Sequence, residues 1–183
     1  LPDLKTSGIK LGFEGDKLNI DTSALPEAER FALSRKLRGA FSGFEISGLW
    51  DKALAAFAAL KPGASTYDLI KALNLSGINF DTDSATITRD SLETLTKAAE
   101  AIKLAPAGTR IEVGGHTDNT GDAAHNLQLS LDRANAVTAK LVELGVDGAA
   151  LAGKGYGQDK PVANNATDEG KALNRRMEFA VIK

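Results

Sequence analysis

The stretch EVGGHTDNTGDAAHNLQLSLDRANAV, residues 112–137, joins the end of an apolar alternation, a polar loop and the start of a helical pattern. Ile111 and Val113 alternate with polar residues, which is typical of a half-buried β-strand. After the loop, apolar side chains recur at helical spacing until Gly145 ends the pattern. These side chains are Leu127, Leu131, Ala134, Val137 or Thr138, Leu141 and Leu144. The stretch therefore predicts a strand, a loop and a long helix.

Strand and helix patterns continue on both sides of this stretch, from residue 78 to the end of the chain. Segments 78–81 and 177–183 have strand character, and the Gly-rich segment 151–157 is a strand or a turn. Asp90 and Glu93 have the spacing of a capping box, which predicts a helix beginning there. We expect an α+β fold in which helices pack on one side of a small mixed β-sheet.

The first 75 residues predict a smaller α+β module of their own. Leu11 and Phe13 alternate ahead of a Gly-containing turn, and Leu18 and Ile20 follow it, which indicates a hairpin. Helical patterns then cover 26–40, 49–60 and 65–74, with a third strand near 43–48. The expected domains are thus 1–75 and 78–183. The aromatic residues of the first domain are assigned to its core: Phe41, Phe44, Trp50 and Phe57.

Composition excludes several classes of function. A net charge of -2 without a Lys/Arg run disfavours nucleic acid as a partner, and the chain has no cysteine for disulfides or thiolate metal sites. No apolar run is long enough to span a bilayer. Because the sequence begins at Leu1 without a leader, we expect a processed or truncated chain whose membrane anchor, if any, precedes it.

The polar loop contains metal-ligand residue types, and a metal site is the first hypothesis to weigh. His116 and His125 are nine residues apart across a loop, with Asp118 and Asp122 between them, and no compact pair of ligands occurs. No cysteine nucleophile and no Gly-x-Ser-x-Gly elbow is present. We therefore expect neither a metal, nor a cofactor, nor catalysis. A metal-dependent hydrolase using His116, Asp118 and His125 remains an alternative.

The charges around this loop suit a zwitterionic ligand. Asp118 follows the strand, and Arg133 lies on the helix, two turns after Asn126 and on the same face. Because helical side chains lean toward the N-terminus, Arg133 points back to the loop. Asp118 would bind an ammonium and Arg133 a carboxylate. The alternative is that Asp118 and Arg133 simply pair with each other.

Four motifs resemble a known family. These are TD-x-x-G at 117–121, N-x-x-LS-x-x-RA at 126–134, G-x-G at 153–155 and NRR-x-E at 174–178. Their order and spacing are similar to the OmpA-like C-terminal domain of Gram-negative bacteria, found in OmpA, Pal and MotB proteins. The resemblance covers about 78–183 and implies a βαβαβ fold. Residues 1–75 are vaguely similar to BON modules, on no specific motif.

The resemblance implies noncovalent binding of peptidoglycan through the diaminopimelate of its stem peptide. Asp118 and Arg133 match the family's charged pair, and His125 stands where the family often has tyrosine. Further residues implied at the crevice are Asn126, Thr117, Gly115 and Leu129, with Asn174, Arg175 and Arg176 in support. We expect a periplasmic, non-enzymatic tether, anchored to the outer or inner membrane through a missing segment. The alternative is an interaction scaffold of a secretion or motility assembly with little wall affinity, whose protein partner binds residues 1–75.

Overall fold

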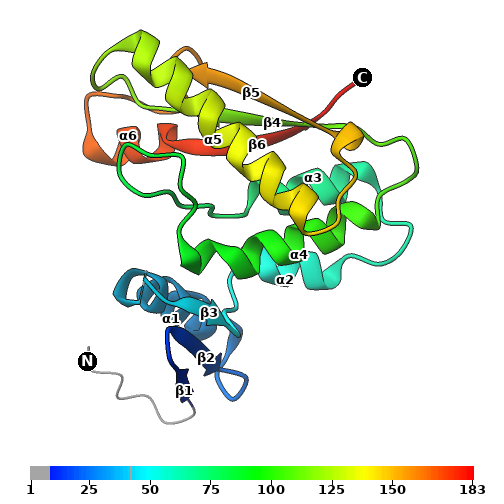
Figure 1. Ribbon diagram of the computed structural model, residues 1–183. Coiled ribbons are helices and arrows are strands. Elements are labelled where there is room, and N and C mark those ends of the chain that lie inside the picture. The colour runs from blue at the N-terminus through cyan, green and yellow to red at the C-terminus, as the bar shows by residue number, and fades with distance from the viewer. Residues whose placement is uncertain (1–8, 42) are drawn as a thin grey trace.

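The N-terminal third of the chain forms a three-stranded sheet covered by a helix (Figure 1). The computed structural model describes residues 9–41 and 43–183. Strands β1 (Lys10–Glu14) and β2 (Lys17–Asp21) are antiparallel, and β3 (Glu45–Ser47) lies parallel to β2. The predicted hairpin and third strand are confirmed.

Three helices complete this part of the molecule, and all three were predicted. They are α1 (Glu27–Ala40), α2 (Lys52–Ala59) and α3 (Thr66–Asn74). Leu18, Leu37 and Ile46 are almost completely buried between α1 and the sheet. Phe57 is buried as well, and the other predicted core aromatics, Phe41, Phe44 and Trp50, pack half-buried against the same core.

A second three-stranded sheet, in the order β5-β4-β6, organises the rest of the chain. β4 (Ile111–His116) is central, β5 (Leu151–Gly157) is parallel to it and β6 (Arg176–Val181) is antiparallel. The long helix α5 (Ala123–Glu143) crosses one face, with α4 (Leu92–Lys103) beside it. The predicted mixed sheet with helices on one side is confirmed. Short elements connect these parts: the 3₁₀ turns η1 (Arg89–Ser91) and η2 (Gly148–Ala150), and α6 (Asp168–Asn174).

The two faces of this sheet differ in polarity. Ile111 and Val113 of β4 are fully buried on the face toward α5, as predicted. The opposite face carries Tyr156, Glu112 and His116, where the Tyr156 hydroxyl donates to Glu112 and the Tyr156 and His116 rings stack. One face of the sheet thus contributes to the core and the other is polar.

The predicted capping box at α4 is wrong. Ser91, not Asp90, is the N-cap residue, and its side chain makes no capping hydrogen bond. Asp90 accepts a hydrogen bond from Arg38 of α1 at 3.0 Å instead. Glu93 accepts from the backbone N–H groups of Gly48 and Leu49 at 3.0 and 3.2 Å. Both carboxylates satisfy donors from the N-terminal part, so neither is available to cap its own helix.

Contacts cross the predicted boundary at residues 75–78. α2 and α3 both pack on α4, and α3 also lies along β6. The Asn74 side chain donates to the Phe179 carbonyl at 3.0 Å and accepts from the Phe179 N–H at 2.7 Å. The division into 1–75 and 78–183 remains a prediction, since the two parts share this contact surface. Within the described residues, no helix is both long and apolar enough to cross a membrane.

Candidate functional site

A cleft of about 430 Å³ opens where the ends of β4 and β6 meet α5 and α6. One wall is formed by residues 78–83, which include the first arm of a hairpin-like segment closed by the Phe80–Ile87 bridge. The predicted strand at 78–81 is reduced to this single bridge. Charged and aromatic side chains dominate the lining: Phe80, Asp83, His116, Arg133, Arg175 and Arg176.

Arg133 lines the cleft and has no carboxylate within ion-pair distance in the described part of the chain. Its Nε–H donates to the Ser84 carbonyl at 2.8 Å and its Nη2 to the Asp81 carbonyl at 3.4 Å. The guanidinium carbon lies 4.9 Å from the centre of the Phe80 ring. Burial lowers the pKa of Arg133, but an arginine keeps its charge at neutral pH. Asp83 in the same cleft stabilises the charge of Arg133 from a longer distance. A half-buried guanidinium without a direct carboxylate partner is suited to an anionic ligand group.

Asp118 pairs with Arg175 and not with Arg133. Its Oδ2 accepts from Arg175 Nη1 at 2.6 Å and its Oδ1 from the Thr120 N–H at 2.8 Å. Burial would raise the pKa of Asp118, but these donors outweigh it and hold the pKa below its ordinary value. The alternative of a direct Asp118–Arg133 pair is therefore wrong. Asp118 itself is not among the residues that line the cleft, but its partner Arg175 is.

Asn126 and Thr117 hold the backbone of the loop that carries Asp118. Both side chains are buried. Asn126 Nδ2 donates to the Thr120 carbonyl at 2.9 Å, and the Thr117 hydroxyl donates to the Asp118 carbonyl at 2.8 Å. Asp122 caps α5 by accepting from the His125 N–H. These contacts fix the Asp118 backbone, so Asn126 and Thr117 position the site.

Gly115 and Leu129 are not among the residues that line the cleft, although each is close in the chain to one that does. A Cβ at Gly115 would lie 2.1 Å from the Ser130 carbonyl oxygen, so this glycine lets β4 approach the α5 backbone. Leu129 is half-buried on α5. The structure gives Gly115 a packing position and places Leu129 away from the cleft lining.

The residues of the NRR motif have three different environments. Asn174 is fully buried, accepts from the N–H groups of Val162 and Ala163, and donates to the Ala163 carbonyl. Arg176 donates to Glu178 at 2.7 Å and to the Lys160 carbonyl at 3.0 Å. These two residues fix the backbone on both sides of Arg175. The half-exposed Arg175 side chain is then oriented by Asp118.

The two histidines lie in separate surroundings. His116 is buried with its Nε2 3.2 Å from Glu178, while His125 is exposed with its Nε2 2.8 Å from Asp83. Burial lowers the pKa of His116, and the hydrogen bond that Asp83 accepts raises the pKa of His125. Within residues 9–41 and 43–183, no three His, Asp or Glu side chains converge as metal ligands do. The geometry gives the metal-dependent hydrolase no support.

Sequence reasoning missed part of the cleft wall. His116, which was considered only as a metal ligand, lines the cleft together with Phe80 and Asp83. The available signal for the last two was the segment INFDTDSATIT, residues 78–88, because it lies within the range 78–183 that the family resemblance covers.

Residues 79–175, more than half of the chain, match the OmpA family. The chain belongs to the OmpA family. The predicted resemblance and fold are thereby confirmed, whereas nothing tests the BON-like similarity of residues 1–75.

Similar proteins come from several envelope systems. Outer membrane porin F of Pseudomonas aeruginosa is 44% identical over 105 residues, which are 57% of this chain and 30% of the porin. The peptidoglycan-binding protein ArfA of Mycobacterium tuberculosis is 39% identical over 120 residues, 66% of this chain and 36% of ArfA. The chain thus spans about a third of the length of these relatives.

Solved structures show the same fold. The peptidoglycan-associated lipoprotein of Burkholderia pseudomallei is 31% identical with a TM-score of 0.52, covering 57% of this chain and 88% of the lipoprotein. The cell wall anchor of the T6SS from Pseudomonas aeruginosa is 28% identical with a TM-score of 0.53, covering 70% of this chain and 96% of the anchor.

Proposed function

We propose that the protein binds peptidoglycan noncovalently through the diaminopimelate of the stem peptide and tethers an envelope protein to the cell wall. The observation that carries the proposal is the Arg133 guanidinium in the cleft, which has no direct carboxylate partner among the described residues, together with the Asp118–Arg175 pair, whose arginine lines the same cleft. Two of the related proteins are named for peptidoglycan binding or association. The role is binding and not turnover, and the compartment is the periplasm.

The zwitterionic end of diaminopimelate carries a carboxylate and an ammonium, which match the opposite charges of Arg133 and Asp118. Its carboxylate pairs with Arg133, whose Nη1 makes no hydrogen bond within the described residues. Its ammonium binds Asp118, either by sharing Oδ2 with Arg175 or by displacing it. Because Oδ1 accepts from Thr120, Asp118 remains oriented while Arg175 moves. Because the zwitterion is neutral overall, its binding leaves the net charge of the site unchanged.

Retention of the purified chain on isolated sacculi tests this function. Asp118→Asn and Arg133→Gln each remove one charged contact, and we expect either change to cost about 2–5 kcal/mol of binding free energy. Arg110→Gln and Asp159→Asn are matched controls at exposed positions away from the cleft, and should bind like wild type. Undiminished retention of both folded site variants would refute the assignment.

The alternative function is an interaction scaffold in a secretion or motility assembly, with little wall affinity and a protein partner at residues 1–75. The similarity to the T6SS anchor, which covers 70% of this chain, supports only the secretion assembly, because that protein is itself described as a cell wall anchor. Wild-type protein that is not retained on sacculi would favour this scaffold over the tether.

A further inference from the structure

The segment 79–88, here called the site loop, contacts the Arg133 side chain through Ser84 near its tip. It closes as a hairpin through the Phe80–Ile87 bridge and the hydrogen bond from the Thr88 N–H to the Asn79 carbonyl at 3.0 Å. Arg133 donates to the Ser84 carbonyl at 2.8 Å and stacks on Phe80. The position of the Arg133 guanidinium therefore depends on the position of this loop.

The base of the site loop is held at the turn before α4. Asn79 Nδ2 donates to Asp90 Oδ2 at 3.2 Å, and the Asn79 N–H donates to Ser91 Oγ at 2.9 Å. Thr88 adds a contact to the same Ser91 hydroxyl at 3.2 Å. Asp90 and Ser91 are both buried, so this base is a fixed point in the fold.

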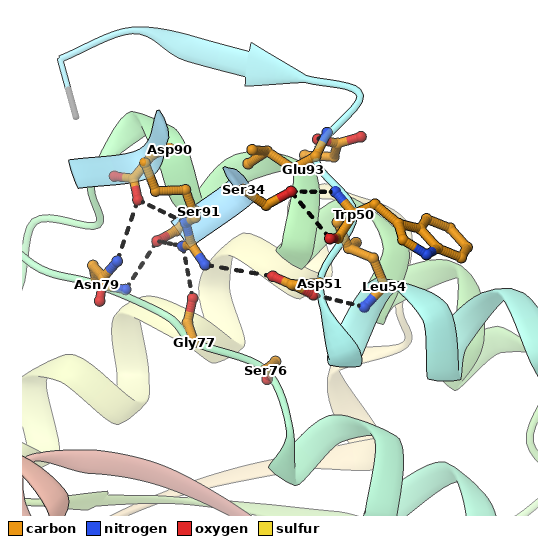
Figure 2. Close-up of polar contacts among 12 residues, drawn as sticks. Ser34, Trp50, Asp51, Leu54, Ser76, Gly77, Asn79, Asp90, Ser91 and Glu93 are labelled. Atoms are coloured by element: carbon orange, nitrogen blue, oxygen red, sulfur yellow. Dashed lines mark hydrogen bonds and ion pairs between the residues drawn. The ribbon is translucent and has the colours of Figure 1, made fainter. Parts of the chain in front are cut away.

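Arg38 from α1 completes this base from the N-terminal part of the chain. Its Nε–H donates to Asp90 Oδ2 at 3.0 Å, and its Nη2 donates to the Gly77 carbonyl at 2.8 Å and Ser91 Oγ at 3.3 Å. The same guanidinium lies 3.8 Å from the Asp51 carboxylate. Figure 2 shows Asn79 bonded to both Asp90 and Ser91, near Gly77. The side chains of Arg38 and Asp90 are only 12% and 3% exposed, so water does not replace these bonds easily.

We propose that Arg38 is a positioning residue for the cleft, through which residues 1–75 set the geometry of Arg133. The connection runs from Arg38 to Asp90 and Ser91, then through Asn79 to Phe80 and Ser84, which contact Arg133. The positioning stands on these contacts alone. Its effect on wall binding rests on the proposed function.

The hydrogen bonds at the base of the site loop require an arginine at position 38. The planar guanidinium donates in three directions at once, and the compact lysine ammonium does not reproduce that fork. Asp90 Oδ1 is buried without a hydrogen-bond partner, so Oδ2 carries all the compensation of this carboxylate. Without Arg38, the buried Asp90 charge is left with the Asn79 amide alone on that oxygen. Asp90 then moves toward water and takes Asn79 with it.

Two variants test this role without leaving the buried Asp90 carboxylate unpaired. Arg38→Lys keeps the charge but loses the fork, and the double variant Arg38→Leu with Asp90→Asn removes both charges together; the longer Arg38–Asp51 contact at 3.8 Å is lost in the double variant as well. The control is Glu93→Ala, which breaks the contacts of α4 with Gly48 and Leu49; among the described residues, Glu93 makes no hydrogen bond to the site loop. Circular dichroism establishes that each variant is folded.

The first readout is the Nε–H resonance of Arg133 in the NMR spectrum, together with the Phe80 ring protons. We expect both to shift, and the Nε–H to exchange faster with solvent, in the two Arg38 variants and not in Glu93→Ala. Retention on sacculi is the second readout, and we expect it to weaken by about 2- to 30-fold in the Arg38 variants, as for coupling through a contiguous network.

Unchanged Arg133 and Phe80 signals in folded Arg38 variants would overturn the proposal, as would an equal shift in Glu93→Ala. Shifted signals with unchanged retention would overturn the effect on wall binding. If wild-type protein does not bind sacculi at all, the proposed function fails, while the NMR signals still decide whether Arg38 positions Arg133.

Discussion

The ion pair of Asp118 and Arg175 makes the site sensitive to acid. Asp118 has a pKa below its ordinary value in the folded chain, so its contribution to stability is present above about pH 4, where an unfolded aspartate is ionised. That contribution is lost as the pH falls through the folded-state pKa. The Arg175 side chain is 50% exposed, so solvent screens much of the interaction.

Arg175→Gln should raise the pKa of Asp118, because the guanidinium no longer stabilises the carboxylate. A pH titration of the Asp118 carboxyl carbon by NMR measures this directly. The free energy of unfolding should fall by at most about 1 kcal/mol at pH 7, and the difference from wild type should shrink at pH 3 and below. An unaltered Asp118 pKa would show that the pair does not form in solution.

Single residues of the site were predicted to different degrees. Arg133 lines the cleft as its helix face predicted, whereas Asp118 pairs with Arg175 and is not among the residues that line the cleft. Their role in ligand binding stays a prediction. The partner of Asp118 was not found, since Arg175 is 57 residues away in sequence and only the folded sheet brings them together. Local periodicity contains no information on such a pair.

The packing of α5 on the sheet depends on glycines whose hydrogens face the helix backbone. A Cβ at Gly115 would lie 2.1 Å from the Ser130 carbonyl oxygen, and one at Gly155 would lie 2.6 Å from the Leu131 nitrogen. Both neighbours are backbone atoms that cannot rotate away. The strand and helix were predicted from their own periodicities, but their close approach was not, because it is a relation between two elements.

Gly115→Ala should lower the free energy of unfolding by about 1–3 kcal/mol, the usual cost of overpacking. The methyl group forces α5 away from β4 and disturbs the loop that carries Asp118. Gly12→Ala is the control, since nothing lies within 4 Å of its Cβ position, and it should change stability by less than about 0.5 kcal/mol. Equal denaturant midpoints for the two variants would contradict this account of the α5 contact.

The wrong prediction of a capping box at α4 also arose because a local sequence pattern does not show contacts between elements. Asp90 and Glu93 have the right spacing for a capping box, yet their partners come from α1 and from the turn after β3. A local rule fails where tertiary donors compete for the same carboxylates. The failure marks the surface where the two parts of the chain meet.

At the scale of the whole molecule, Asn74 joins the N-terminal helices to the second sheet. Its side-chain amide pairs with both the N–H and the carbonyl of Phe179 on β6, as a neighbouring strand would. Most elements of both parts were predicted from the sequence; the predicted strand at 78–81 is only a bridge, and 151–157 was predicted as a strand or a turn. The docking of the two parts was not predicted, because residues 74 and 179 are far apart in sequence and only the tertiary fold brings them together.

Asn74→Ala should lower the free energy of unfolding by about 1–3 kcal/mol, because the N–H of the buried Phe179 loses its partner. We expect faster amide hydrogen exchange at Phe179 and along α3, which then loses its attachment to β6. Lys71→Ala, an exposed change on the same helix, is the control and should leave both quantities nearly unchanged. If Phe179 stays as protected in Asn74→Ala as in wild type, the amide pair does not hold the two parts together, and residues 1–75 are then better treated as an independent module.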